Sequence, residues 1–423
     1  MNKSFLAQGG TPISAELATE LRQLVFGTSA VPMRAEWTQT PFIYGAPKEE
    51  LPYGLRSPRN ATRGLLSVVQ AFALKYFLFS RKARSSCNTD LLSPSVEMQR
   101  LALVTAMVEI LRNIADKGKV IMVLHSPDDE PFVPHTVTYF HDSVTEKLYV
   151  FTLSPHDELE FFIKRNFNQF TEEDTPGTLL FLYSAVLTRT MGKIRTDLDS
   201  NNQPLTLPTN EEGSLMIVTL LISGRATPHI HNGVINVGDE NSYAVPQYGI
   251  LSRCTIGLLL WENECGQARN SSSSAPVVMR QPGSRLKTPT SPIWVTSCAG
   301  HFGVLFNQNP ELLRNYHAES RFDVMYYSCS GHQLSMTIDN RTYNEMACSM
   351  LERQSPSSEN NSLSGRGNKD EQNGRGNSVD IISQEENTLN TPLQRLIHTK
   401  WEEAHIRFHG QPSLLSYLFS TNQ

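Results

Sequence analysis

The chain has 423 residues, of which 39% are hydrophobic, and a formal net charge of -5. This hydrophobic content can fill a sizeable core, either in one large α+β domain with insertions or in two or three smaller domains. The acidic balance and the shortness of the basic clusters exclude the strongly basic surface of nucleic-acid-binding proteins, so we expect no nucleic-acid partner.

The start of the sequence and its cysteines indicate a cellular compartment. Residues 1–23 lack the apolar core of a signal peptide, and no uncharged stretch is long enough to span a membrane. The six cysteines include no CxxC pair, which is typical of reduced thiols and argues against a disulfide framework or a zinc site. We therefore expect an intracellular, cytoplasmic protein with no membrane partner, no metal and no cofactor.

Hydrophobic periodicity predicts alternating helices and strands along the chain. The expected helices are 14–25 with a C-cap at Gly27, 64–79, 94–116 with Ser93 as cap, 157–167 and 178–190. The expected strands are 120–124, a hairpin of 136–140 with 148–152, a hairpin of 293–298 with 301–306, and a hairpin of 322–328 with 333–339.

The stretch from Tyr53 to Ser80 is the most informative part of the sequence for predicting the fold and the site. Its second half is apolar on most sides, so it reads as a buried helix in the middle of a domain. Asn60 or Thr62 could cap this helix, which leaves its N-terminal amides open to a loop that ligands can reach. We expect any chemistry to occur at that end.

This stretch resembles the MINDY deubiquitinases, a family of papain-like cysteine peptidases that trim polyubiquitin. The family has a G-[VL]-L-x-x-V-Q helix directly after its nucleophilic Cys, and GLLSVVQ at 64–70 and YGL at 53–55 match that frame. The resemblance implies an α+β papain-like fold, with helices packed on an antiparallel sheet. It places Arg63 at the nucleophile position and Ser57 at the position of the oxyanion Gln.

Arg63 removes the nucleophile that such a site needs. A helix N-terminus favours a thiolate, whereas a guanidinium stays protonated and has no lone pair for attack. Arg63 could be a solvated side chain left in an abandoned site, which we favour, or it could bind an anion.

A second motif, S-P-I-W-V followed by H-F-x-x-L-F, covers 291–306. In the resembled family this pattern carries the catalytic His at the start of the return strand, which is His301 here. A Cys-His pair works because the imidazole takes the thiol proton and later returns it to the leaving amine. Without a cysteine at position 63, we expect His301 to be a hydrogen-bonded packing residue.

Several other residues could carry chemistry, and we consider each a weaker candidate. His229 and His231 form an H-x-H turn without a nearby ligand partner, and His405 and His409 have i, i+4 spacing on an expected helix without an HExxH motif. We regard both histidine spacings as coincidence and do not expect either pair to bind a metal. Cys298 or Cys87 could replace the missing thiol, although neither is expected on the helix that faces His301.

The domain organisation follows from a change of composition near the end of the chain. We expect a MINDY-type domain over 1–350, a disordered Ser/Asn-rich insertion over 351–391, and a segment over 392–423 that returns to the same domain. The T-K-W at 399–401 resembles the closing segment of the family.

The resemblance implies an inactive member of a family that cleaves K48-linked polyubiquitin. The first hypothesis is a pseudoenzyme whose partner is ubiquitin or polyubiquitin. The alternatives are a residual cysteine-type deubiquitinase that uses another thiol, and a structural or interaction protein without ubiquitin affinity.

Overall fold

The computed structural model describes residues 9–57, 59–81, 90–116, 118–199, 203–207, 212–238, 245–262, 281–341 and 391–409. Its helices are α1 (Ala15–Phe26), α2 (Ala35–Thr38), α3 (Arg63–Phe79), α5 (Val96–Ala115), the short 3-10 turn η2 (Thr145–Lys147), α6 (Leu159–Arg165), α7 (Asn168–Thr171), α8 (Gly177–Arg189), α9 (Met191–Asp197), α10 (Leu215–Ser223), α12 (Ser284–Lys287), α13 (Tyr316–Ser320) and α16 (Pro392–His398). Its strands are β1 (Thr11–Pro12), β2 (Ile43–Tyr44), β3 (Leu55–Arg56), β4 (Val120–His125), β5 (Leu148–Leu153), β6 (Val234–Val237), β7 (Val245–Tyr248), β8 (Gly257–Trp261), β9 (Ile293–Cys298), β10 (His301–Phe306), β11 (Arg321–Ser328), β12 (His332–Asp339) and β13 (His405–His409).

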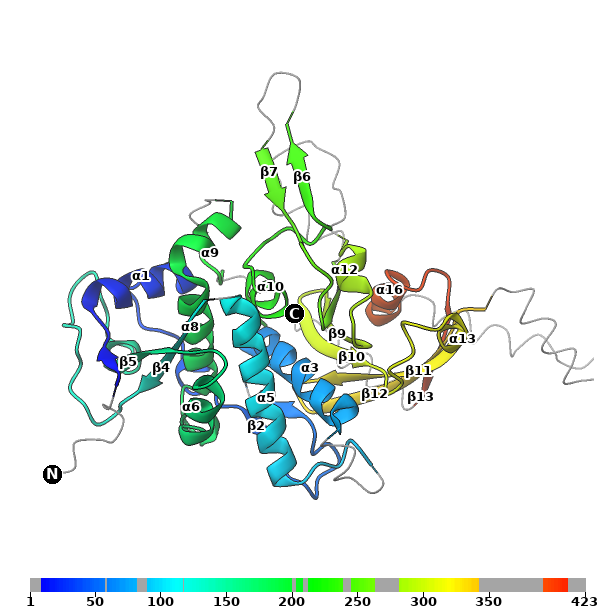
Figure 1. The fold of residues 1–423 in the computed structure, drawn as a ribbon, viewed down its shortest axis with the longest axis horizontal. Helices are drawn as coiled ribbons and strands as arrows, with labels where there is room; N and C mark the ends of the chain where they lie inside the picture. Colours follow the sequence, from blue (N-terminus) through cyan, green and yellow to red (C-terminus); the bar gives the residue numbers. More distant parts are fainter. Residues whose placement is uncertain are drawn as a thin grey trace, which may run out of the picture.

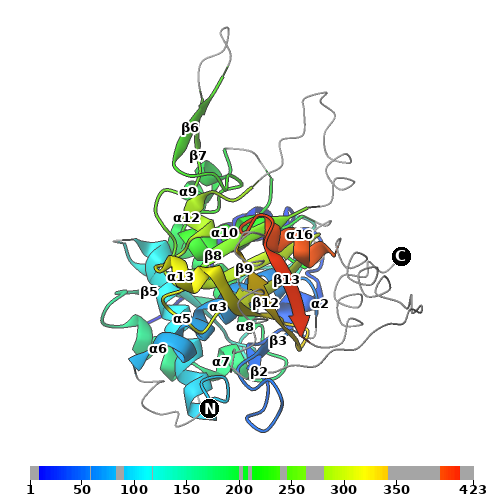
Figure 2. The same ribbon diagram turned by 90° about the vertical axis from the view of Figure 1, so that its right-hand side faces the viewer.

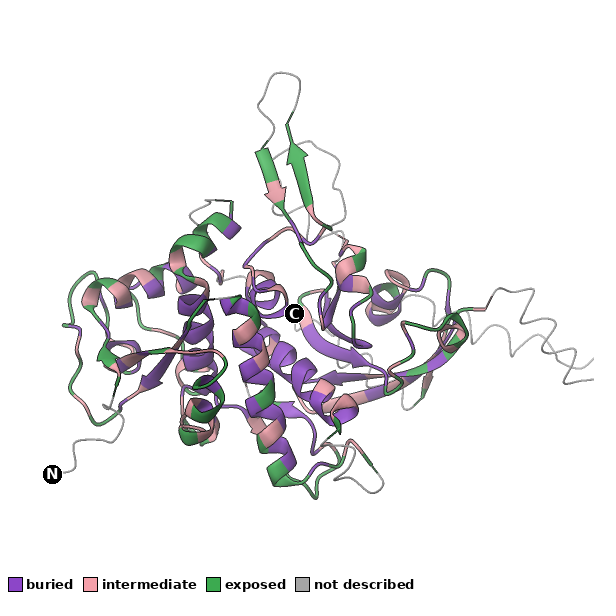
Figure 3. Ribbon diagram, viewed as in Figure 1, coloured by how far each residue is buried: buried purple, intermediate pink, exposed green. Residues whose placement is uncertain are grey.

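Helix α3 lies in the middle of the fold (Figure 1). All its residues except Arg63, Lys75 and Phe79 are buried, as the ribbon coloured by exposure shows (Figure 3). It packs against β9 and β10 on one side and against α5 and α10 on the other. Its sequence is apolar on nearly all sides because other core elements surround the helix.

A six-stranded sheet with the order β13-β12-β11-β10-β9-β8 forms the wall opposite the helices. Its pairs are antiparallel except β8 with β9, which is parallel. Helix α16 packs on β8 and β9, and its residues Leu393, Leu396 and Ile397 join a second buried cluster with Trp294 and Trp401. The fold is therefore of the α+β class, as expected, although the sheet is not purely antiparallel.

The structure confirms several predicted boundaries. Helix α1 starts at the N-cap Ser14 and ends at Gly27, whose φ of 79° is the left-handed conformation that glycine adopts readily. The predicted hairpins of β9 with β10 and of β11 with β12 are both present.

Three predictions about local structure were wrong. Residues 136–140 form turns, and β5 pairs with β4 and β1 in a separate three-stranded sheet. Helix α5 is capped by Ser95, whose hydroxyl accepts from the amide of Met98, so it begins after the expected Ser93 and Pro94. Its start is set by that hydrogen bond and not by the N1 proline.

The third wrong prediction concerns the end of the chain. His405 and His409 lie on strand β13, paired with β12, and not on a helix. On a strand, i and i+4 residues are about 13 Å apart, so the two imidazoles do not have zinc-pair spacing. The capping box of Thr391 and Gln394 starts α16, which packs on the six-stranded sheet, and β13 is the edge strand of that sheet.

The expected insertion at 351–391 lies outside the described residues except for Thr391. The division into a domain over 1–350 and a returning segment over 392–423 stays a prediction. None of the described helices combines the length and the apolar character that crossing a membrane requires.

Candidate functional site

Arg63 is the first residue of α3, at the end that faces a loop. The N-cap is Thr62, but its side chain makes no capping bond. The amide of Arg63 instead donates to the carbonyl of Asn60 at 2.9 Å, and the amide of Gly64 donates to the carbonyl of Glu212 at 2.7 Å. Two of the N-terminal amides that helices normally leave free are therefore used within the protein.

Glu212 brings the site together, and it was not predicted from the sequence. Its Oε1 lies 2.5 Å from Nη1 of Arg63 and 3.1 Å from Nδ1 of His301. Its Oε2 accepts from the amide of Phe302 at 2.9 Å. One carboxylate thus joins the start of α3 to the start of β10.

The surroundings of Glu212 favour its charged form. Burial alone would raise the pKa of this carboxyl, but the hydrogen bond from His301, the Arg63 charge and the Phe302 amide outweigh burial, so the pKa of Glu212 is lowered. The helix dipole of α3 adds to this preference because its N-terminal end is positive. The same dipole disfavours Arg63, and the carboxylate compensates for it.

Gly213 allows Glu212 to lie so close to α3. It has φ +129°, and a Cβ added there would come within 3.1 Å of the Gly64 nitrogen. A larger residue would push the 212–214 segment away from the helix. No sequence motif marks Glu212; the only signal was that a buried cation at position 63 would need an anion.

Arg63 is therefore not a solvated side chain, and that expectation is wrong. Its side chain is 19% exposed and paired with Glu212, because a guanidinium at this depth needs a counter-charge. His301 fits the expectation of a hydrogen-bonded residue: its Nδ1 contacts Glu212, and its side chain is 26% exposed. It begins β10 after the two-residue turn at Ala299 and Gly300.

Comparison with known proteins identifies the family. Residues 22–410 match the family described as "Deubiquitinating enzyme MINDY-3/4, conserved domain". The chain belongs to the MINDY-3/4 family. The chain is 27% identical over 415 residues to the human protein named "Probable ubiquitin carboxyl-terminal hydrolase MINDY-4". The aligned region covers 97% of this chain and 47% of the human protein.

Two further relatives in the MINDY-3/4 family show the same likeness. The chain is 30% identical over 334 residues to the Bos taurus MINDY-4 protein, covering 78% of this chain and 41% of that protein. It is 25% identical over 323 residues to "Ubiquitin carboxyl-terminal hydrolase MINDY-3" of Mus musculus, covering 71% of this chain and 67% of that protein. The chain spans about half the length of the MINDY-4 relatives. No solved structure matches the chain significantly.

Ser57 lies next to the start of α3 in this MINDY-3/4 domain. Its hydroxyl donates to the carbonyl of Arg59 and lies 3.2 Å from the hydroxyl of Thr62. Its amide donates to the carbonyl of Cys329 at 2.8 Å. These contacts hold the approach to the helix, and the described hydrogen bonds of Ser57 include none to Arg63 or His301.

The thiols that the structure describes are Cys254, Cys298 and Cys329, and all three are buried. Burial raises the pKa of Cys254 to about 11 and that of Cys329 to about 12, and it raises that of Cys298 further. Each is thus a protonated thiol at neutral pH, and a protonated thiol is a poor nucleophile. Cys87 lies outside the described residues.

Two of the histidines considered as metal ligands, His229 and His409, contact other side chains. Nε2 of His229 lies 2.5 Å from Oδ2 of Asp199, and its ring is 5.7 Å from that of His231. Nε2 of His409 lies 2.7 Å from the hydroxyl of Thr337. Over the described ranges, no three His, Cys, Asp or Glu side chains are grouped as a metal site would require.

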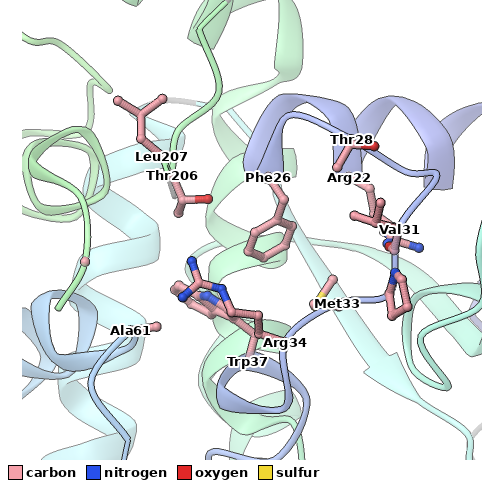
Figure 4. A pocket seen from close by; sticks show the side chains of 12 residues that line it. Arg22, Phe26, Thr28, Val31, Met33, Arg34, Trp37, Ala61, Thr206 and Leu207 are labelled. Carbon is pink, nitrogen blue, oxygen red and sulfur yellow. The ribbon is translucent and has the colours of Figure 1, made fainter. Parts of the chain in front are cut away.

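A pocket of about 340 Å³ opens beside the site, between α1, α2 and the segment around Thr206 (Figure 4). Phe26, Met33 and Trp37 give it apolar walls. Trp37 is 3% exposed, so it is both a core residue and a pocket wall. Ala61 and Gly213 line the end of the pocket nearest the site and are close in sequence to Arg63 and Glu212.

Proposed function

We propose that this protein is a MINDY-type pseudoenzyme that binds ubiquitin or polyubiquitin without hydrolysing it. The main observation in support is that position 63, at the start of the buried helix, holds a guanidinium paired with Glu212. In the family pattern that we matched at 64–70, this position precedes the G-L-L helix and belongs to the nucleophile. A guanidinium has no lone pair with which to attack an isopeptide carbonyl.

The main-chain contacts at the helix start support the same proposal. Acyl transfer needs free hydrogen-bond donors aimed at the developing oxyanion. Here the amides of Arg63 and Gly64 already donate to Asn60 and Glu212, and Ser57 offers a hydroxyl where the family pattern has an amide donor. Both the nucleophile and the oxyanion donors would be missing.

The residue opposite His301 also supports the proposal, because position 63 of this chain holds Arg63 and not the cysteine of the family pattern. In a Cys-His pair the ring accepts the thiol proton. Here Nδ1 of His301 contacts a carboxylate that also binds Arg63, so the ring belongs to the group of side chains around Glu212. We assign His301 the role of holding Glu212 in place.

The family's substrate supplies the proposed ligand. The relatives are named as ubiquitin carboxyl-terminal hydrolases, and a site that has lost its chemistry can keep a binding surface. We propose a papain-like arrangement of α3 against β9 and β10, and K48-linked chains as the first ligands to test.

Two measurements on the full chain test the proposal. Defined ubiquitin chains and a cysteine-reactive ubiquitin probe should give neither cleavage nor a covalent adduct, and robust cleavage or adduct formation would overturn the inactive half. Titration with mono-ubiquitin and K48-linked tetra-ubiquitin should show binding at or below about 100 µM, with tighter binding of the chain. Absence of binding at that concentration would overturn the ubiquitin half and favour an interaction protein with another partner.

The remaining alternative, a hydrolase with a substitute thiol, has a separate signature. It requires activity that disappears on Cys298→Ala or Cys87→Ala. For Cys298 the burial and the raised pKa of the thiol count against it.

A further inference from the structure

Strands β6 and β7 form a two-stranded ribbon that stands away from the rest of the molecule (Figures 1 and 2). All four residues of β6 are exposed, and neither strand contains a charged residue. The exposed large apolar side chains of the ribbon and the residues after it are Val234, Ile235, Val237, Val245, Tyr248 and Leu251. Such a cluster is typical of an interaction site.

The two faces of the ribbon differ. Side chains alternate between the faces, and directly paired residues share a face. Tyr248, paired with Val234, lies under the guanidinium of Arg225 at 5.3 Å, so that face is partly covered at its base. The other face carries Ile235, Val237 and Val245, which are 45%, 48% and 62% exposed.

The hydrogen-bond pattern shows which main-chain groups point outward. The amide of Gly249 donates to the carbonyl of Gly233, and the amide of Gly233 donates to the carbonyl of Ile250, so the strands are hydrogen-bonded just before the pair of Val234 with Tyr248. Hydrogen-bonded and non-hydrogen-bonded pairs alternate in antiparallel strands. The pairs of Val234 with Tyr248 and of Asn236 with Pro246 are therefore non-hydrogen-bonded, and their main-chain groups face the two outer edges.

The outer edge of β7 is closed to further pairing. Pro246 has no amide hydrogen to offer there, and proline is a common means of blocking an edge strand. The outward carbonyl of Tyr248 already accepts from the hydroxyl of Thr227 at 2.8 Å. One outward donor of this edge is therefore absent and one outward acceptor is already bonded, which disfavours pairing with a new strand.

The outer edge of β6 is open. It presents the amides and carbonyls of Val234 and Asn236, and no described residue forms a main-chain ladder with them. The edge has no proline and no charge, so it lacks the features that prevent pairing. A two-stranded ribbon is also marginally stable in water, and additional strands stabilise it.

We infer that β6 pairs with β6 of a second copy of this chain, in an antiparallel and two-fold symmetric arrangement. An uncharged edge can meet itself without electrostatic repulsion, whereas a charged one cannot. Placing Ile235 opposite Ile235 of the second copy makes Val234 and Asn236 the hydrogen-bonded positions, as their outward direction requires. The result is a four-stranded sheet, β7-β6-β6-β7, with one continuous apolar face.

The oligomeric state of the full chain tests this inference. Sedimentation over roughly 1 to 100 µM should show a monomer-dimer equilibrium. Ile235→Lys places two like charges opposite each other and should weaken the dimer at least about tenfold. Gln247→Lys, which adds the same charge on the same face but on the closed strand, should leave the dimer unchanged and is the matched control.

Two further variants distinguish this edge from other contacts. Asn236→Pro removes an outward amide that the ribbon itself does not use, so it should produce a monomer with unchanged unfolding. Ile235→Cys should form an intermolecular disulfide under mild oxidation, because directly opposed non-hydrogen-bonded residues have suitable spacing. Val237→Cys, which is off the two-fold axis, should not form one beyond the background of the parent chain.

A wild-type chain that stays monomeric at all these concentrations would overturn the inference, as would a dimer that Ile235→Lys and Asn236→Pro leave intact. A monomer that captures an extended apolar peptide at β6 would show an open edge with a different occupant, and would also overturn the assignment of a second copy. None of these outcomes depends on ubiquitin binding.

Discussion

Arg63 and Glu212 are 149 positions apart in the sequence, yet their side chains meet at 2.5 Å where α3 begins. The contact is largely shielded, with 19% and 6% of the two side chains exposed. A shielded pair of this kind leaves an uncompensated charge when one partner is removed. Its removal should therefore affect folding even if the site has no catalytic role.

Glu212→Gln should lower the free energy of unfolding by about 2–4 kcal/mol, because Arg63 would lose its counter-charge while the side chain keeps its shape. Urea denaturation of the full chain measures the change. Glu311→Gln is the control: its pair with Arg314 is more than half exposed on both sides, and it should change stability by less than about 0.5 kcal/mol. Equal effects of the two variants would contradict the buried ion pair.

Arg63→Met in the Glu212→Gln background should cost much less than Arg63→Met alone. The single variant leaves Glu212 charged and buried, whereas the double variant leaves neither charge. A double-mutant cycle should give a coupling of about 1–3 kcal/mol. Additive losses would mean that the two residues act independently.

The stability contributed by Glu212 should depend on pH. The pKa of Glu212 in the folded protein lies below the ordinary value of 4.5. The folded state therefore stabilises the charged carboxylate relative to the unfolded state. The contribution is fully present above about pH 4.5 and is lost as the pH falls through the lower, folded-state pKa. The difference in unfolding free energy between wild type and Glu212→Gln should therefore shrink as the pH falls from about 4.5 through the lower, folded-state pKa of Glu212. A difference that stays constant over that interval would exclude this linkage.

The sequence predicted α3, α1 and the two hairpins of the large sheet because local patterns determine them. A largely apolar run makes α3, and Ser14 and Gly27 mark the ends of α1. These signals lie within a few residues of the element that they specify. The Arg63 and His301 positions came instead from the resemblance to the family motifs at 53–70 and 291–306.

The features that the sequence did not predict depend on contacts between distant residues. Glu212 lies in a polar stretch that resembles any loop, and it reaches the site only because the 212–214 segment passes the start of α3. Strand β13 has alternating exposure and is a strand because β12 offers it a free edge. Residues 136–140 have a β-like composition but find no partner strand within the described part of the chain.

Arg63→Cys alone should restore almost no hydrolysis of K48-linked chains. The new thiol would lie beside the Glu212 carboxylate, which disfavours a thiolate, and the amide of Gly64 would still donate to the carbonyl of Glu212 and not to an oxyanion. Cleavage of tetra-ubiquitin and labelling by a ubiquitin probe measure the result. Substantial turnover by this single variant would show that the surrounding site is still competent.

Trp401→Ala should destabilise the whole domain by about 3–5 kcal/mol. Trp401 is 2% exposed, and its ring lies 5.4 Å from Trp294 and 5.1 Å from Phe322. Fluorescence and circular dichroism should report one shifted transition if residues 391–409 fold with the domain. An unshifted main transition would mean that this segment is a separate unit.

The position of β13 in the large sheet also bears on biosynthesis. β12 ends at Asp339 and β13 begins at His405, so a ribosome adding about 5–20 residues per second needs several seconds between the two strands. During that interval β13 is not yet available to pair with β12, and an unpaired strand edge can associate with other chains. We expect this edge to be protected from such association once His405 to His409 have paired with β12.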